Sequence, residues 1–156
     1  MDGAPNRIPW PPIVFLAAIV AAWALDWLLP LRLPHPASPL WQVAGLTLIL
    51  AGLMLDFWTA HTLYRHRTTI LPHRAVTQLV TSGPFALSRN PIYIGNTAVV
   101  LGLGLAFAIV WPLLAAPVAA FAVQKLAIER EEDHLARRFG RAWYLYAART
   151  PRWLLF

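Results

Sequence analysis

The 156-residue chain contains no cysteine, and it carries little charge. Without cysteine it has no disulfide, no thiolate nucleophile and no cysteine metal site. Only 13% of its residues are charged, whereas a soluble domain carries about a quarter. Acidic residues are the scarcest, with seven Asp and Glu against 13 Lys and Arg. The composition therefore argues against a soluble domain and excludes any chemistry that depends on a thiol.

Apolar residues, in contrast, make up 58% of the chain. Four apolar stretches cover residues 10–29, 40–63, 92–110 and 111–128. A membrane-spanning helix needs roughly 17–25 mostly apolar residues. The last two stretches meet at Trp111-Pro112, which predicts a tight helical hairpin. We therefore expect an all-α integral membrane protein with about four transmembrane helices, a C-terminal cytoplasmic helix and a single domain over residues 1–156.

The basic residues predict how the helices are oriented. The loop at residues 31–39 has only Arg32, and the Trp111-Pro112 turn has none. Two other segments are rich in arginine: Arg65, Arg67, Arg74 and Arg89 in the middle, and Arg130, Arg137, Arg138, Arg141, Arg149 and Arg152 in the tail. Because basic loops stay in the cytoplasm, four spans place both segments and both termini there, in a bacterial-type inner membrane. The net charge of +6 then indicates contact with membrane lipids and not with nucleic acid.

The middle segment contains Ser-Gly-Pro, typical of a turn, followed by Arg89-Asn90-Pro91. Asn90 is suited to cap a helix that starts at Pro91. A helix N-terminus beside Arg89 attracts a carboxylate. The alternative is purely structural: Asn90-Pro91 starts a helix, Arg89 contacts lipid phosphate and Tyr93 is an interfacial aromatic residue. Local chemistry alone leaves both interpretations open.

The tail holds four of the seven acidic residues within Glu129–Asp133, followed by Phe139-Gly140. Glu131 and Glu132 are adjacent, so on a helix they point about 100° apart and serve different purposes. A solvent-exposed helix with Glu–Arg pairs explains this composition equally well.

Taken together, the two segments resemble the isoprenylcysteine carboxyl methyltransferases and the related phospholipid N-methyltransferases. The shared pattern is a Leu-Val-Thr-x-Gly-Pro-aromatic turn, then Arg-His/Asn-Pro-x-Tyr-x-Gly, an apolar hairpin, Glu-Glu, Phe-Gly, Tyr-x-x-Tyr and a basic, aromatic end. This chain shows it in order between Leu79 and Trp153. The resemblance implies a small helical membrane enzyme that uses S-adenosyl-L-methionine to methylate a lipophilic or lipid acceptor, at a cytoplasmic pocket closed by the C-terminal segment.

The resemblance also implies site residues, in two regions at about 77–95 and 129–153. The cofactor-binding positions would be Thr77, Gln78, Leu79, Val80, Phe85, Asn90, Pro91, Ile92, Tyr93 and Glu131. The catalytic candidates are Arg89, Glu132 and Arg149. Glu132 is expected to face the helices or the arginines, with a mainly structural role or that of a base.

Two positions depart from the carboxyl methyltransferase pattern. Asn90 stands where those enzymes have histidine, and it cannot titrate near neutral pH. Ala127 stands where they have an arginine implicated in holding the substrate carboxylate. Lys125, Arg130 or Arg149 could replace that arginine, and prenylcysteine as the acceptor is in doubt.

The sequence supports only weaker predictions for the other polar residues. The spacing of His61, His66 and His73 predicts no metal site, although His66, His73 and Glu132 are the candidates for a base. Asp26 lies near the end of its span. Asp56 lies deeper, where it could reach His61 or Arg65, and a structural and a functional role are both open. Gly102-x-Gly104 resembles a glycine motif proposed in phospholipid methyltransferases, but such a step in a membrane helix more often serves helix packing, which is the expectation here.

Two further functions compete with methyl transfer. One is an NADPH-dependent lipid reductase, because sterol reductases share a similar C-terminal cofactor pattern. The other is a membrane scaffold without catalytic activity. Binding of S-adenosylmethionine or of NADPH would distinguish the three.

Overall fold

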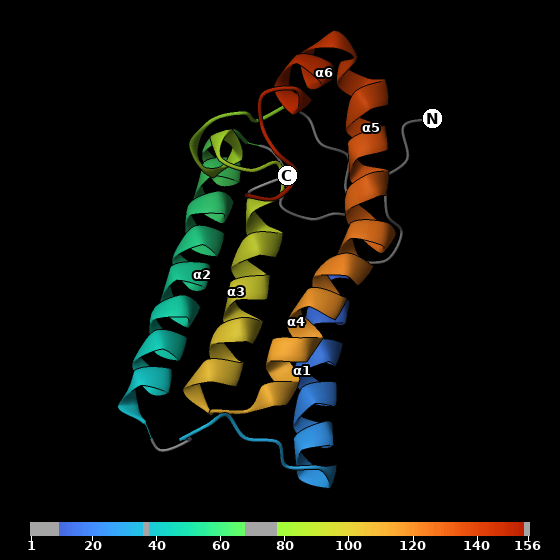
Figure 1. Ribbon diagram of the computed structural model, residues 1–156. Helices are drawn as coiled ribbons and strands as arrows, with labels where there is room; N and C mark the ends of the chain where they lie inside the picture. Colours follow the sequence, from blue (N-terminus) through green and yellow to red (C-terminus); the bar gives the residue numbers. More distant parts are fainter. Residues whose placement is uncertain (1–9, 36–37, 68–77, 155–156) are drawn as a thin grey trace.

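The computed structural model describes residues 10–35, 38–67 and 78–154, which fold into helices and connecting turns (Figure 1). The first two helices are α1 (Trp10–Leu28) and α2 (Pro39–Arg65). A short 3₁₀ turn, η1 (Gly83–Ala86), precedes α3 (Pro91–Ala106). The chain then forms α4 (Val110–Val123), a π-helical turn η2 (Gln124–Ile128), α5 (Glu129–Phe139) and α6 (Arg141–Ala147).

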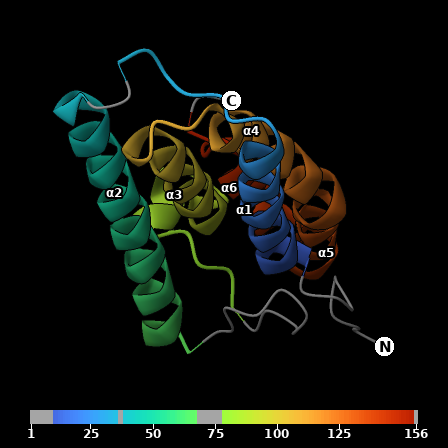
Figure 2. The same ribbon diagram turned by 90° about the horizontal axis from the view of Figure 1, so that it is seen from below.

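The membrane helices stand side by side in the order α2, α3, α4 and α1 (Figures 1 and 2). Helix α3 packs against α2 on one flank and α4 on the other. Helix α5 rises beyond this group and carries α6 at its far end (Figure 1). The expectation of an all-helical integral membrane protein is confirmed for the described residues, which contain three helical stretches long and apolar enough to span a bilayer.

The first two predicted spans agree with the structure closely, but the hairpin differs. The turn predicted at Trp111-Pro112 is wrong by a few residues, since α3 ends at Ala106 and α4 begins at Val110. The reason is that proline is tolerated in the first turn of a helix, so Pro112 lies within the first turn of α4 and does not form the hairpin turn. With 16 residues, α3 is only about 24 Å long, shorter than α1 and α2.

The fourth span was predicted to end near residue 128, but the helix does not end there. Helix α4, the π turn and α5 form one helical stretch, Val110–Phe139, of 30 residues. The first real interruption is Gly140, whose φ of +49° is a conformation that favours glycine. The acidic segment is therefore a continuous extension of a membrane helix.

Glycines determine the close packing of α2 on α3. A side chain on Gly52 would meet the Gly95 carbonyl oxygen at 2.6 Å, and one on Gly102 would meet the Gly45 carbonyl oxygen at 2.8 Å. Gly104 instead faces Leu113 of α4. The prediction that Gly102-x-Gly104 serves helix packing is thus confirmed, with the two glycines on different interfaces. Small residues allow such close backbone approach in membrane helices.

At the end of the bundle opposite α6, the α1–α2 loop is fastened to the α3–α4 turn. Leu33 N donates to Ala108 O at 2.9 Å, and the Trp111 indole donates to Leu29 O at 2.7 Å. Asp26 pairs with Arg32 at 3.0 Å. Its carboxylate is therefore balanced by the arginine of the following loop.

Candidate functional site

The start of α3 meets the start of α5 through a side-chain hydrogen bond. The Tyr93 hydroxyl lies 3.0 Å from Glu131 Oε1 and 3.2 Å from Oε2, and it donates to this carboxylate. Tyr93 is only 7% exposed. The structure thus brings together two residues that the sequence assigned to one cofactor site.

Asn90 lies at the N-cap position of α3 but does not act as a side-chain cap among the described residues. Its amide Nδ2 donates instead to the Arg152 carbonyl oxygen at 3.1 Å. The same oxygen accepts from Ser88 Oγ at 2.9 Å, and Arg89 N donates to Pro151 O at 2.9 Å. The capping prediction is therefore wrong for the side chain, because the C-terminal segment offers Asn90 a tertiary acceptor.

Glu132 points away from Tyr93 and bridges two arginines. Arg152 donates to both of its oxygens, at 3.1 and 2.6 Å, and Arg89 Nη1 lies 3.3 Å from Oε1. The hydrogen bond to Glu132 raises the pKa of Arg152 above its usual range. The Arg89 guanidinium also lies 5.7 Å from the ring centre of Trp143. Of the two surroundings predicted for Glu132, the helices or the arginines, the structure shows the arginines, whereas Glu131 contacts Tyr93.

Arg152 is the tail arginine that pairs with Glu132, and the sequence interpretation did not name it as a site residue. Arg149, the predicted catalytic arginine, is exposed, and its Nε donates to the Leu145 carbonyl oxygen at 3.1 Å. The two lie three residues apart in the tail, so the sequence could not show which one returns to Glu132.

The loop before α3 holds the remaining predicted cofactor residues. Val80 is buried, Leu79 is half-buried and Gln78 is exposed, whereas Thr77 lies outside the described residues. The Phe85 carbonyl oxygen accepts a hydrogen bond of 2.7 Å from the Tyr146 hydroxyl. Burial raises the pKa of Tyr146, so it remains a neutral donor. This bond fastens the loop to α6.

An apolar cluster surrounds Tyr93. It contains buried Phe15 from α1 and Ile128 from the π turn, with half-buried Ile92 and Trp153 packed against it. The Trp153 indole Nε1 also donates to Gln124 Oε1 at 2.8 Å. The sequence interpretation found neither Phe15 nor the Trp153–Gln124 pair, because no local motif marks contacts between such distant segments.

The donor set at this site suits a zwitterionic ligand. The Glu131 carboxylate can accept hydrogen bonds from an ammonium or hydroxyl group. Arg89 Nε is buried without a hydrogen-bond partner among the described residues. Such a donor is suited to an anionic oxygen. An acidic and a basic group, the two charge types that a zwitterion needs, are therefore present at this end of the bundle.

Asp56 lies apart from this cluster, between α2 and α3. Its Oδ1 is buried against Gly95, and it has no hydrogen-bond partner in the described parts of the chain. The predicted contacts with His61 or Arg65 are not observed, since His61 stacks on Phe57 and Arg65 ends α2. Helix geometry explains this, because α2 directs Asp56 toward α3.

Two of the three histidines considered in the sequence, His61 and His66, lie at the C-terminal end of α2. His66 Nδ1 lies 2.9 Å from the Thr62 carbonyl oxygen, and His73 lies outside the described residues. Within residues 10–35, 38–67 and 78–154, no group of three or more His, Cys, Asp or Glu side chains is placed to hold a metal ion.

A family model for phospholipid methyltransferases matches residues 40–142. The chain belongs to the phospholipid methyltransferase family. The match runs from α2 to the start of α6 and so includes Asn90, Tyr93 and Glu131. The segment that contains Arg152 and Trp153 lies beyond the match.

Two curated relatives are similar over about half of the chain. The nickel-cobalt-cadmium resistance protein NccN of Alcaligenes xylosoxydans xylosoxydans is 41% identical over 78 residues, 50% of this chain and 36% of that protein. The cobalt-zinc-cadmium resistance protein CzcN of Cupriavidus metallidurans is 40% identical over 73 residues, 47% of this chain and 33% of that protein. The matched stretch thus spans about a third of each relative's length. No solved structure matches significantly.

Proposed function

We propose that this family member transfers a methyl group from S-adenosylmethionine to a lipophilic or membrane-embedded acceptor that bears a carboxylate or an amine. The observation that carries the proposal is the Tyr93–Glu131 hydrogen bond beside the buried Asn90. These residues belong to two separate motif segments of the sequence, and the fold joins them at one end of the membrane helices.

Within this proposal, Glu131 would accept hydrogen bonds from the cofactor's ammonium or ribose hydroxyls, and Arg89 would face its carboxylate. Tyr93 holds the Glu131 carboxylate in place. S-adenosylmethionine supplies the methyl group on a sulfonium, so the protein needs mainly to orient the reactants and exclude water. Phe15, Ile92 and Trp153 pack in the same apolar cluster as Tyr93, and such a cluster would help to exclude water.

The C-terminal segment would close the site. Three hydrogen bonds join it to the Ser88–Asn90 loop, and Arg152 joins it to Glu132. Glu132 is fully engaged with two arginines, which supports a structural role over that of a base. We also propose that the site and both termini face the cytoplasm of a bacterial inner membrane.

Two alternatives remain distinguishable by ligand. An NADPH-dependent reductase would be stabilised against thermal unfolding by NADPH. A scaffold would be stabilised by neither NADPH nor S-adenosylmethionine. The names of the relatives concern metal resistance, and we propose methylation of a membrane component as the activity through which such a protein would act.

The proposal is tested by supplying radiolabelled S-adenosylmethionine to the purified protein with fractionated lipid extracts. The proposed function predicts transfer of label into a lipid-extractable product, and loss of that transfer in Glu131→Gln. Thermal shift with S-adenosylhomocysteine and with NADPH provides the second measurement. Stabilisation by NADPH alone would instead establish the reductase, and a protein indifferent to both ligands would be a scaffold.

A further inference from the structure

The helix that carries Glu131 contains a π turn just before the site. Across Gln124–Ile128 the helix is π-helical, and the Glu129 amide donates to the Gln124 carbonyl oxygen, five residues back. Such turns are rare, occur mostly as single turns within α-helices and are frequent at functional sites. The wider turn accommodates one extra residue, so it sets the direction of every side chain in α5 relative to α4.

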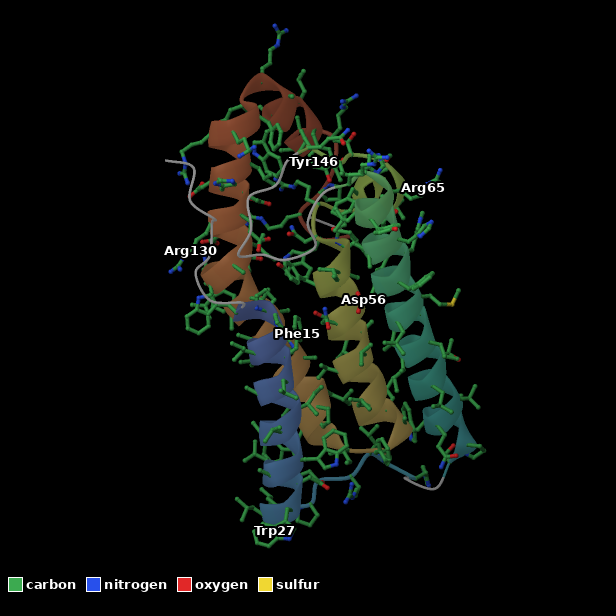
Figure 3. All side chains as sticks on the ribbon, turned by 180° about the vertical axis from the view of Figure 1, so that it is seen from behind. Phe15, Trp27, Asp56, Arg65, Arg130 and Tyr146 are labelled. Atoms are coloured by element: carbon green, nitrogen blue, oxygen red, sulfur yellow. The ribbon has the colours of Figure 1, made fainter. Side chains whose placement is uncertain are left out.

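One residue of register decides which side chain meets Tyr93. Successive residues of an α-helix are rotated by about 100°. With the π turn present, Glu131 faces Tyr93, while Arg130 is exposed and points away from the bundle (Figure 3). If this turn relaxed to a regular α-helix, residues after it would rotate by one position. Arg130 would then occupy the place of Glu131.

Trp153 of the C-terminal segment contacts the π turn. Trp153 Nε1 donates to Gln124 Oε1 at the first residue of this turn, at 2.8 Å. Trp153 also packs on the apolar cluster that includes Ala127 and Ile128, both fully buried residues of the turn. A segment beyond the family match therefore contacts the turn that orients the predicted cofactor-binding carboxylate.

We propose that the π turn, fastened by the Trp153–Gln124 hydrogen bond, selects Glu131 over Arg130 for the site, and that Gln124 and Trp153 are positioning residues for cofactor binding. This inference rests on the proposed function, in which Glu131 binds S-adenosylmethionine. Neither residue needs to touch the cofactor. Their effect passes through the register of α5.

The test is a rescue experiment read by calorimetric binding of S-adenosylhomocysteine. Gln124→Leu removes the acceptor, and Trp153→Phe removes the donor while keeping an aromatic ring. Each is expected to weaken binding three- to tenfold, and the double variant to be no weaker than the worse single variant, because both changes remove one interaction. Arg130→Glu alone is expected to leave binding within twofold, since this side chain points away.

The decisive variant combines Gln124→Leu with Arg130→Glu. It offers a carboxylate in either register, so binding should return to within twofold of the wild type. A purely structural role for Gln124 predicts no rescue, because an exposed residue on the far side of α5 cannot repair a general packing defect. Melting curves of all variants report folding separately.

The outcomes separate the two proposals. If the wild type does not bind S-adenosylhomocysteine, the proposed function fails. If the wild type binds and Gln124→Leu binds equally well, or if Arg130→Glu does not rescue it, the positioning role of the π turn is refuted and the proposed function stands.

Discussion

Tyr93 and Glu131 are 38 residues apart in the chain, yet the tyrosine hydroxyl lies 3.0 Å from the carboxylate. The intervening hairpin of α3 and α4 returns the chain to the same end of the bundle, and α5 continues α4 without a break. Because successive residues of a helix are rotated by about 100°, Glu132 points in a different direction from Glu131 and contacts Arg89 and Arg152 instead. Two adjacent carboxylates therefore have separate partners, which makes their roles separable by mutation.

Glu132→Gln should reduce stability. The change leaves two partly buried guanidinium groups without their shared counter-ion. Breaking a fully buried pair costs roughly 3–5 kcal/mol. Because these groups are partly exposed, we expect a loss of about 2 kcal/mol, seen as a lower melting temperature in detergent. Glu129→Gln is the matched control, since Glu129 pairs with exposed Lys125, and an equal effect of both variants would contradict the assignment.

Arg152 and Arg149 should differ in the same way. Arg152→Ala removes two hydrogen bonds to Glu132, so the free energy of unfolding should fall by roughly 1–3 kcal/mol. Arg149→Ala removes an exposed side chain bonded to its own helix and should change it by about 0.5 kcal/mol or less. Chemical unfolding in mixed micelles measures both. A larger loss for Arg149→Ala would mean that the tail returns to the bundle in another register.

The glycine contact between α2 and α3 should not tolerate a side chain. In Gly52→Ala the added methyl group meets the Gly95 carbonyl oxygen, a backbone atom that cannot move aside easily. We expect a cost of roughly 1–3 kcal/mol from overpacking, measured by thermal melting. Leu53→Ala, on an exposed face of the same helix, is the control. Equal melting temperatures for the two variants would show that α2 packs differently.

We expect the arginine-rich segments to set the orientation of the protein in the membrane. Reporter fusions at Met1 and at Phe156 should both give a cytoplasmic signal, because four crossings return the chain to the side that retains basic loops. A fusion within the Arg32 loop should give the opposite signal. A periplasmic signal at either terminus would contradict the four-crossing topology.

The helices could be predicted because their signal is local. Apolar stretches of sufficient length predicted α1 and α2 to within about two residues. The hairpin turn was misplaced because Pro112 is equally suited to a turn and to a helix start. The continuity of α4 with α5 was missed because a change from apolar to charged residues looks like the end of a span. Only Gly140 marks the real end.

The site could be predicted in part, for a related reason. Asn90, Tyr93 and Glu131 belong to ordered sequence patterns, and the structure places Tyr93 and Glu131 in contact. The partners of these patterns could not be predicted. The contacts of Arg152 and Gln124 depend on how the tail folds back and on the π turn. Neither feature produces a periodicity or a spacing that can be recognised in the sequence.

We propose that Glu131, held by Tyr93, binds S-adenosylmethionine. Calorimetric titration of the purified protein with S-adenosylhomocysteine tests it most directly. We predict binding to the wild type, a loss of about tenfold or more for Glu131→Gln, as expected when a charged, partly buried hydrogen-bonding group is removed, and a much smaller loss for Glu132→Gln. Wild-type binding that is unchanged by Glu131→Gln but abolished by Glu132→Gln would contradict the account.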